Sequence, residues 1–313
     1  MLELTTTRHN PMIDPSLHVW SWEIPLYLFI GGLVAGMMII SGYFLFSKRY
    51  KEIDCVCYSL PLISLIVLSI GMFSLFLDLE HKLFVWRLYT TLKISSPMSW
   101  GAWILILVYP VIIANFLMNP LKFIEVKFPQ ITKLTTFIHQ RPRLIQNIGI
   151  VNMILGGMLG IYTGVLLSAM GSRPLWNSSI LSILFLVSGL SGAAAFVHMI
   201  AQNVKERELL AKADNSFLIL ELFVIMLLLV GLLTTSKVHI AAARLLLDGP
   251  FAAQFWVFVI FLGIIVPLII QLLAVNHKIK HTPVAPVMVI IGGLILRFII
   301  VYAGQFSKYL NVL

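Results

Sequence analysis

Hydrogen-bonding and ionisable side chains occur in this sequence mainly beside long apolar stretches. Such groups are costly next to or inside a membrane, so each is a functional hypothesis. Arg297 stands well inside an apolar stretch and therefore needs a carboxylate, backbone carbonyls or a water-filled cavity. The others are polar or aromatic residues at the ends of the stretches, where aromatic belts and snorkelling also place such side chains. They are His18, Glu23, Tyr27, Asp78, Glu80, Arg87, Tyr89, Trp100, Tyr162 and Gln305.

Four of these residues have the chemistry that a quinone requires. A quinone has an apolar tail and two carbonyl oxygens, and its reduction takes up two protons. His18, Tyr27 and Tyr162 offer hydrogen-bond donors for the carbonyl oxygens. Asp78 offers a carboxylate close by for proton transfer. Composition alone does not distinguish such a pocket from the substrate site of a transporter.

The sequence argues against a redox centre held by this chain itself. Only His198, of eight histidines, lies clearly within an apolar stretch, whereas bis-histidine haem needs facing pairs. The two cysteines, Cys55 and Cys57, are too few for an iron–sulfur cluster. No Walker, Rossmann or HExxH motif is present. We expect neither haem nor an iron–sulfur cluster in this chain.

Membrane-spanning helices must position these residues. The 313-residue chain is 59% hydrophobic and 11% charged, which indicates an all-α integral membrane protein. About 20 apolar residues cross a bilayer as a helix. Eight stretches meet this length, at residues 24–46, 58–77, 99–118, 147–170, 178–200, 216–236, 251–274 and 284–305.

The distribution of Lys and Arg predicts the orientation of these spans. The connections after spans one, three, five and seven hold 13 Lys and Arg, against 8 in the termini and the other connections. Cytoplasmic loops are enriched in these residues, so both termini should lie on the outer, periplasmic side. The net charge of +9 is thereby explained without nucleic acid as a partner. The residues of the suspected quinone site gather at the outer end.

A faint internal repeat divides the chain. Leu28-Phe29 precedes Gly32 and Ala35-Gly36 at the spacing with which Leu184-Phe185 precedes Ser188 and Ser191-Gly192. We predict an outer segment, 1–23, followed by two four-helix halves, 24–170 and 171–313. The repeat also suits a secondary transporter. At the inner end, Glu221, His198 and Asn152 are candidates for the start of a proton path from the cytoplasm.

Four motifs are spread over nearly the whole chain. In order they are WSWEIPLYLFIGG at 20–32, SPMSWGAW at 96–103, GIYTGVLLSA at 160–169 and LRFIIVYAGQ at 296–305, and the last two are the most specific. In sequence and in order, they resemble the NrfD / polysulfide reductase membrane-subunit family. One departure is Asp78-Leu-Glu-His-Lys82, where many relatives have a Gly-Arg-Pro-like turn after the aspartate. The positive charge of that turn is expected at Lys82 or Arg87.

The resemblance implies an eight-helix, quinone-reactive anchor in the bacterial inner membrane. It implies menaquinone or ubiquinone as the electron carrier and, on the outer face, a peripheral iron–sulfur subunit of the four-cluster type. It also implies a catalytic subunit, either a molybdopterin enzyme or a multihaem cytochrome. The family's site residues fall on His18 and Asp78, and on Tyr162 and Arg297 within the two motifs. We retain a secondary transporter and a purely structural anchor as alternatives.

Overall fold

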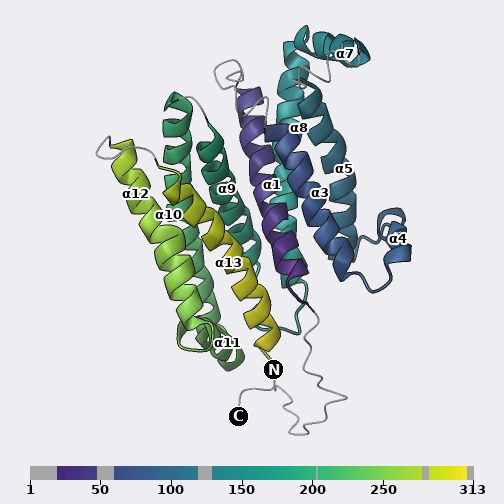
Figure 1. Cartoon of the computed structure of the whole chain (residues 1–313). Helices are drawn as coiled ribbons and strands as arrows, with labels where there is room; N and C mark the ends of the chain where they lie inside the picture. Colours follow the sequence, from purple (N-terminus) through teal and green to yellow (C-terminus); the bar gives the residue numbers. More distant parts are fainter. Residues whose placement is uncertain (1–19, 48–59, 119–128, 202–203, 277–281, 309–313) are drawn as a thin grey trace.

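The chain is all-helical over the residues that the computed structural model describes, which are 20–47, 60–118, 129–201, 204–276 and 282–308. Among them, eight helices are long and apolar enough to cross a membrane, which confirms the predicted spans (Figure 1). The chain is a multi-pass membrane protein. The spans are α1 (Glu23–Phe46), α3 (Leu60–Asp78), α5 (Pro97–Met118), α8 (Pro142–Ser168), α9 (Ile180–Ile200), α10 (Val204–Thr234), the π-helical η3 (Gln254–Ile265) continued by α12 (Val266–Val275), and α13 (Val284–Phe306).

Short helices mark the two ends of the bundle. α7 (Pro129–His139) lies at one end, and α4 (Trp86–Thr90) and α11 (Lys237–Leu247) lie at the other (Figure 1). A single 3₁₀ turn, η2 (Lys82–Phe84), precedes α4. We call these the α7 end and the α4 end. The first turn of α1 and the last turn of α13 both lie at the α4 end.

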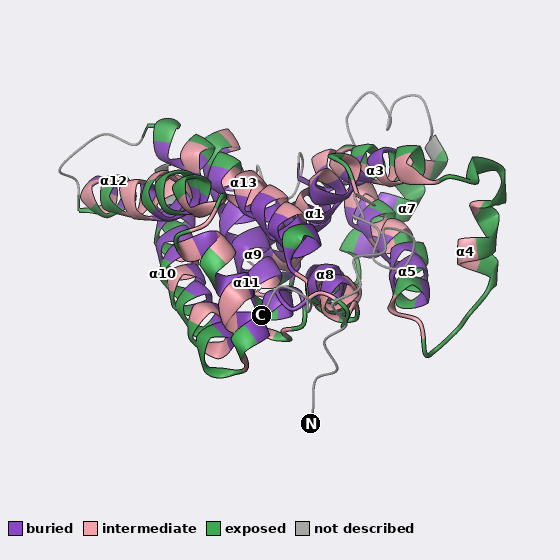
Figure 2. Ribbon diagram, turned by 90° about the horizontal axis from the view of Figure 1, so that it is seen from below, coloured by how far each residue is buried: buried purple, intermediate pink, exposed green. Residues whose placement is uncertain are grey.

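The spans gather into two groups that meet at α1. α3, α5 and α8 lie on one side of α1, and α9, α10, α12 and α13 lie on the other (Figures 1 and 2). Small residues allow the close contact between α1 and α9 that their sequences predict. A Cβ atom on Gly189 would meet the backbone of Gly32, and one on Gly36 would meet the backbone of Gly189. The bundle interior is correspondingly tight, and 78% of the α1 span is buried.

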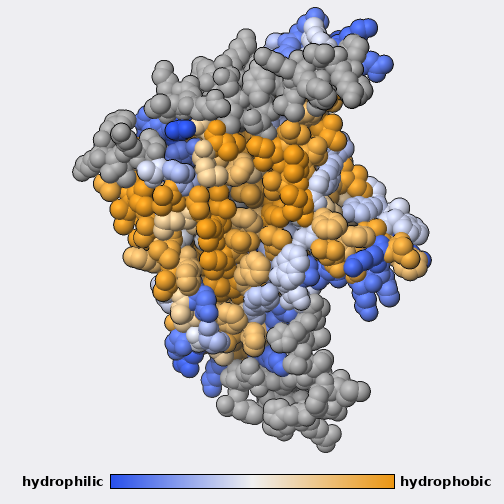
Figure 3. Space-filling view, in the orientation of Figure 1, coloured by the Kyte–Doolittle hydropathy of each residue, from blue (hydrophilic) through white to orange (hydrophobic). Residues whose placement is uncertain are grey.

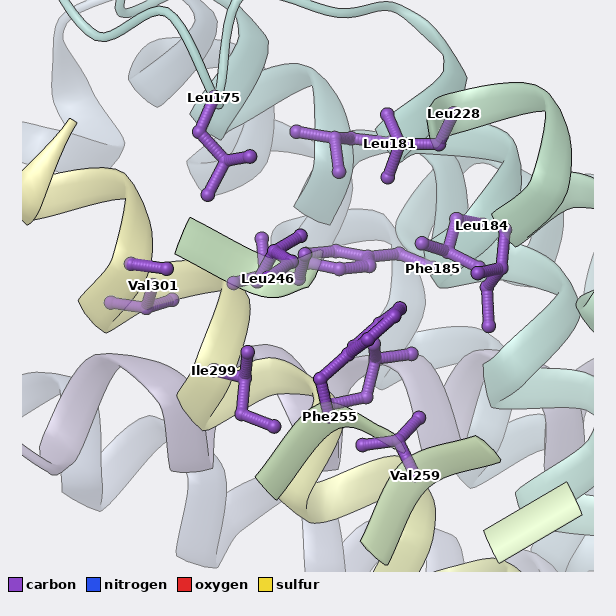
Figure 4. Close-up of a cluster of buried hydrophobic side chains, with 14 of the residues drawn as sticks. Leu175, Leu181, Leu184, Phe185, Leu228, Leu246, Phe255, Val259, Ile299 and Val301 are labelled. Carbon is purple, nitrogen blue, oxygen red and sulfur yellow. The ribbon is translucent and has the colours of Figure 1, made fainter. Parts of the chain in front are cut away.

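The outward surface suits lipid. A broad apolar belt separates the more polar ends of the molecule (Figure 3). Only 33% of the α3 span is buried, and its exposed residues Ile66, Ile70 and Phe73 are apolar. The second group contains a large apolar cluster, in which Phe185 and Phe255 pack among leucines and valines (Figure 4).

α10 begins earlier than the hydropathy pattern predicts. The expected span starts at residue 216, whereas the helix starts at Val204. Residues 204–213 are mostly Lys, Glu, Leu, Arg and Ala, which are strong helix formers despite their charge. The added turns bring Asp214 into the bundle, where its side chain is 0% exposed.

Candidate functional site

Two predicted site residues, Tyr27 of α1 and Tyr162 of α8, come together towards the α4 end. Both are buried, and they are electrostatic neighbours. The Tyr162 ring packs on Gly101 of α5, where a Cβ atom would overlap the ring and its hydroxyl. Three different spans therefore position these two phenols.

Two further tyrosines extend this group. Tyr89 of α4 and Tyr109 of α5 are both electrostatic neighbours of Tyr27. Tyr109 also lies 3.4 Å, oxygen to oxygen, from the Ser69 hydroxyl on α3. Partial burial, and secondarily the neighbouring Tyr109, raise the pKa of Tyr89, so its hydroxyl keeps its proton. We call Tyr27, Tyr89, Tyr109 and Tyr162 the tyrosine cluster.

Two carboxyl groups lie at the same end. Asp78, the last residue of α3, is half-buried, and its electrostatic neighbour is Glu23 at the start of α1. The Ser74 hydroxyl donates to the Glu23 backbone carbonyl at 2.9 Å, which joins α3 to α1 here. Glu23 Oε2 is buried and has no hydrogen-bond partner in the described part of the chain. Buried carboxylate oxygens are normally bonded, so this atom is available to a ligand, a proton or water.

The remaining predictions at this end have different outcomes. Arg87 lies over the rings of Phe84, at 4.6 Å, and Trp86, at 5.6 Å, and no ion pair joins it to Asp78 within the described residues. His18 lies outside the described residues. The Trp20 backbone, two residues later, is held by Gln305. Trp20 N–H donates to Gln305 Oε1 at 3.1 Å, and Gln305 Nε2 donates to the Trp20 carbonyl at 2.9 Å.

Arg297 occupies a separate site inside the second group of helices. The side chain is 1% exposed and lies 4.6 Å above the Phe185 ring. It donates to the Ser188 hydroxyl at 2.5 Å and to the Phe185 carbonyl at 2.9 Å. Glu221 of α10 lies near both Ser188 and Arg297, but no ion pair joins Arg297 to Glu221 within the described residues. Of the alternative partners that the sequence allowed for Arg297, the structure supplies backbone carbonyls, those of Phe185 and Gly293.

A second buried carboxyl group, missed from the sequence, lies near Glu221. Asp214 accepts from the Ser191 hydroxyl and from Gln271 Nε2, each at 2.7 Å. The available signal was the seven-residue spacing from Asp214 to Glu221, which places both on one face of a helix. Asn152 instead belongs to another site, because its amide donates to the Met38 carbonyl and the Ser41 hydroxyl of α1.

The two polar groups differ in what they can do. The tyrosine cluster presents phenolic donors in a bundle that also places two carboxyl groups, Glu23 and Asp78, near its α4 end. That combination can bind the carbonyl oxygens of an apolar molecule and exchange protons with it. Among the described residues, no group of three His, Cys, Asp or Glu is arranged to hold a metal ion.

Comparison with known proteins identifies one family. Residues 8–307 match the family model described as "Polysulphide reductase, NrfD". The chain is 32% identical to the C subunit of the polysulfide reductase of Wolinella succinogenes, over 92% of this chain and 94% of that protein. It is 29% identical to the NrfD homolog of Haemophilus influenzae, over 95% and 97% of the two chains. It is also 29% identical to NrfD of Escherichia coli, over 92% and 96%.

Proposed function

Because this chain belongs to the polysulphide reductase NrfD family, we propose that it is the quinone-reactive membrane subunit of a respiratory oxidoreductase. It exchanges electrons between a peripheral iron–sulfur subunit and menaquinone or ubiquinone in a bacterial inner membrane. The observation that carries the proposal is the pair of buried phenols, Tyr27 and Tyr162, at the end of the bundle where Asp78 and Glu23 also lie. Phenolic donors and carboxyl groups suit a molecule with two carbonyl oxygens whose reduction takes up protons.

The four side chains take different roles in this proposal. Tyr162 and Tyr27 donate hydrogen bonds to the quinone oxygens, and His18 joins them from the segment before α1. Asp78 holds and transfers protons, with the partnerless oxygen of Glu23 beside it. Two electrons and two protons convert a quinone to a quinol, and the reverse reaction releases both pairs. Arg87 remains at the same end over the Phe84 and Trp86 rings, and we keep it, with Lys82 as the alternative, as the residue that tunes the charge of Asp78.

The partners belong at the α4 end. The relative from Wolinella is by name one subunit of a polysulfide reductase, which supports membership of a multi-subunit complex. We place an iron–sulfur subunit against the α4 end, and beyond it a catalytic subunit, which is a molybdopterin enzyme or a multihaem cytochrome. The α4 end then faces the periplasm, in agreement with the excess of Lys and Arg at the other end. Residues 24–170 and 171–313 form the two four-helix halves.

The test is Asp78→Asn in the complex purified from native membranes. We expect quinone-linked turnover to fall about 100-fold, since a positioned proton-transfer group contributes about that much. Electron transfer from the partner subunits to a soluble dye should be unchanged. Glu80→Gln is the matched control, because it neutralises an exposed carboxylate two residues away. Unchanged quinone turnover in Asp78→Asn would remove Asp78 from the site, and absence of both quinone and partners would refute the function.

A further inference from the structure

An apolar groove lies where the two groups of helices meet, towards the α7 end. Its volume is about 510 Å³, which is within the range of sites that bind small molecules. Residues of α1, α8, α9 and α10 line it, so both groups of helices contribute. We call it the interhelical groove, and its lining includes Tyr43, Met153, Leu190, Lys212, Ala213 and Phe217.

The interhelical groove has a buried apolar base and an open edge. Ile40, Phe44 and Leu210 line it and are buried in one apolar cluster. Tyr43 and Leu209 also line it, but they are 50% and 37% exposed. These residues belong to the membrane spans α1 and α10, so the groove opens within the membrane-spanning part of the molecule. An apolar groove at this depth favours hydrocarbon over water.

Two hydrogen-bond donors stand at the edge of the interhelical groove. The Lys212 side chain is 56% exposed, and it comes shortly before the apolar stretch that begins at residue 216. A Lys in this position extends its charge to the level of the lipid headgroups. Its ammonium donates to Glu208 at 2.8 Å, and because an ammonium has three donors, two remain for a ligand. Tyr43 supplies the second donor group, a phenol near the end of α1.

The α7 end as a whole is basic. The connections predicted at this end hold 13 Lys and Arg, against 8 in the rest of the chain. Lys133, Arg141 and Arg143 are exposed there. The cytoplasmic leaflet is negatively charged, and basic pockets between spans on that side bind anionic lipid headgroups. A phosphate group is therefore complementary to Lys212 and to the surface around it.

From these observations we propose that the interhelical groove binds one anionic phospholipid of the cytoplasmic leaflet. One acyl chain lies in the groove against Met153, Leu190 and Phe217, and the phosphate accepts hydrogen bonds from Lys212 and Tyr43. The lipid contacts both groups of helices and so joins them at this end. This inference goes beyond the proposed function, because it does not depend on quinone chemistry and concerns the opposite end of α1 from Tyr27.

The test uses the complex purified from native membranes in mild detergent. The probe is a phosphatidylglycerol that carries a photoreactive diazirine within one acyl chain. Irradiation, digestion and mass spectrometry then identify the labelled peptides. Labels should concentrate on the peptides that contain Met153, Leu190 and Phe217. An excess of unlabelled phosphatidylglycerol should remove most of this labelling, and the same excess of phosphatidylcholine should remove little of it.

One variant tests the headgroup contact. Lys212→Gln removes the charged donor and should weaken labelling of the interhelical groove about tenfold, as expected for loss of a hydrogen bond between charged groups. Lys133→Gln is the control, because it removes an exposed Lys at the same end that does not line the groove. Unchanged labelling in Lys212→Gln would contradict the proposed contact with the phosphate.

A second variant tests the acyl-chain contact. Ala213→Phe places a ring in the interhelical groove and should abolish labelling there. Val230→Phe places the same ring on an exposed position of the same helix outside the groove, so labelling should persist. Thermal unfolding in detergent without added lipid shows whether each variant folds. Lys212→Gln alters only an exposed side chain, so its labelling decides the proposal even if Ala213→Phe fails to fold.

Three further outcomes would overturn the proposal. Labelling spread evenly over the exposed faces of all spans would show only the lipid that surrounds any membrane protein. Equal competition by phosphatidylcholine would contradict the choice of an anionic lipid. Displacement of the label by a long-chain quinone, but not by phosphatidylglycerol, would mean that the groove holds a quinone tail instead. Quinone-linked turnover at the α4 end is a separate measurement, so the proposed function stands or falls independently.

Discussion

The phenol ring of Tyr162 lies directly on the backbone of Gly101. A Cβ atom at position 101 would overlap Cζ, Cε1 and the hydroxyl oxygen of the ring. Cβ atoms essentially never approach other atoms so closely, so any side chain at 101 must displace Tyr162. Gly101 therefore determines where α8 presents this phenol, and the contact joins α5 to α8 at the site.

Gly101→Ala should damage both packing and activity. Overpacking a tight contact costs about 1–3 kcal/mol, and here the ring must move to relieve it. We expect a lower unfolding temperature in detergent and a higher quinone KM. The control is Gly157→Ala on the same α8 helix, where an added Cβ meets nothing within 4 Å. Equal behaviour of the two alanine variants would show that Tyr162 can relocate freely.

Tyr162→Phe tests the hydroxyl without removing the ring. A hydrogen bond contributes about 1 kcal/mol net, which corresponds to about a fivefold change in binding. The quinone KM should rise by about that factor, while the unfolding temperature changes little. Tyr43→Phe removes an exposed hydroxyl towards the opposite end of α1 and should leave the KM unchanged. A Tyr162→Phe enzyme with the wild-type KM would exclude the phenol as a quinone ligand.

Arg297 and Glu221 should depend on each other for stability. Arg297→Met removes the positive charge that offsets the cost of burying the Glu221 carboxylate, so this variant should be less stable than the wild type. Arg297→Met combined with Glu221→Met removes both charges and should recover most of that loss. Thermal unfolding of the two single variants and the double variant measures the coupling. The partly exposed pair Lys212–Glu208, at 2.8 Å, is the comparison and should show coupling of only about 0–1 kcal/mol. Additive effects at positions 221 and 297 would contradict the pairing.

The sequence predicted the spans well because their signal is local. A run of about 20 apolar residues can be recognised without knowing its neighbours. The start of α10 was wrong, because a charged stretch can still be helical when its residues favour helix. That error hid Asp214, which looked like part of a loop although it is fully buried.

The site was only partly predictable, because local sequence patterns do not specify which residues of different helices come into contact. The sequence placed Tyr27 and Tyr162 at the same end of the membrane, and the structure brings them together. It also required a partner for Arg297, but Ser188 and Glu221 come from two other helices. Asn152 shared a depth with Glu221, yet it bonds α1 instead, because depth does not specify which neighbour a helix faces.

We expect Gln305 to help fix the position of the segment that carries His18. Its side chain both accepts from and donates to the Trp20 backbone, and the Trp20 ring packs on Trp176 at 5.1 Å between centroids. Gln305→Leu removes both hydrogen bonds, which weakens this attachment by about 1–3 kcal/mol. If His18 binds quinone, Gln305→Leu should no longer hold His18 in position for that contact, and the quinone KM should rise.

The matched control for Gln305→Leu is Gln146→Leu at the α7 end. Gln146 also bonds a backbone carbonyl, that of Phe46 at 3.2 Å, but it lies near the start of α8 and beside the last residue of α1, at the opposite end of both helices from Tyr27 and Tyr162. The quinone KM should rise only in the Gln305 variant. In limited proteolysis, the segment before Trp20 should be cut faster in that variant than in the Gln146 variant. Faster cleavage with an unchanged KM would mean that the segment is released but that His18 has no part in quinone binding. The proposed site would then consist of Tyr27, Tyr162 and the two carboxyl groups alone.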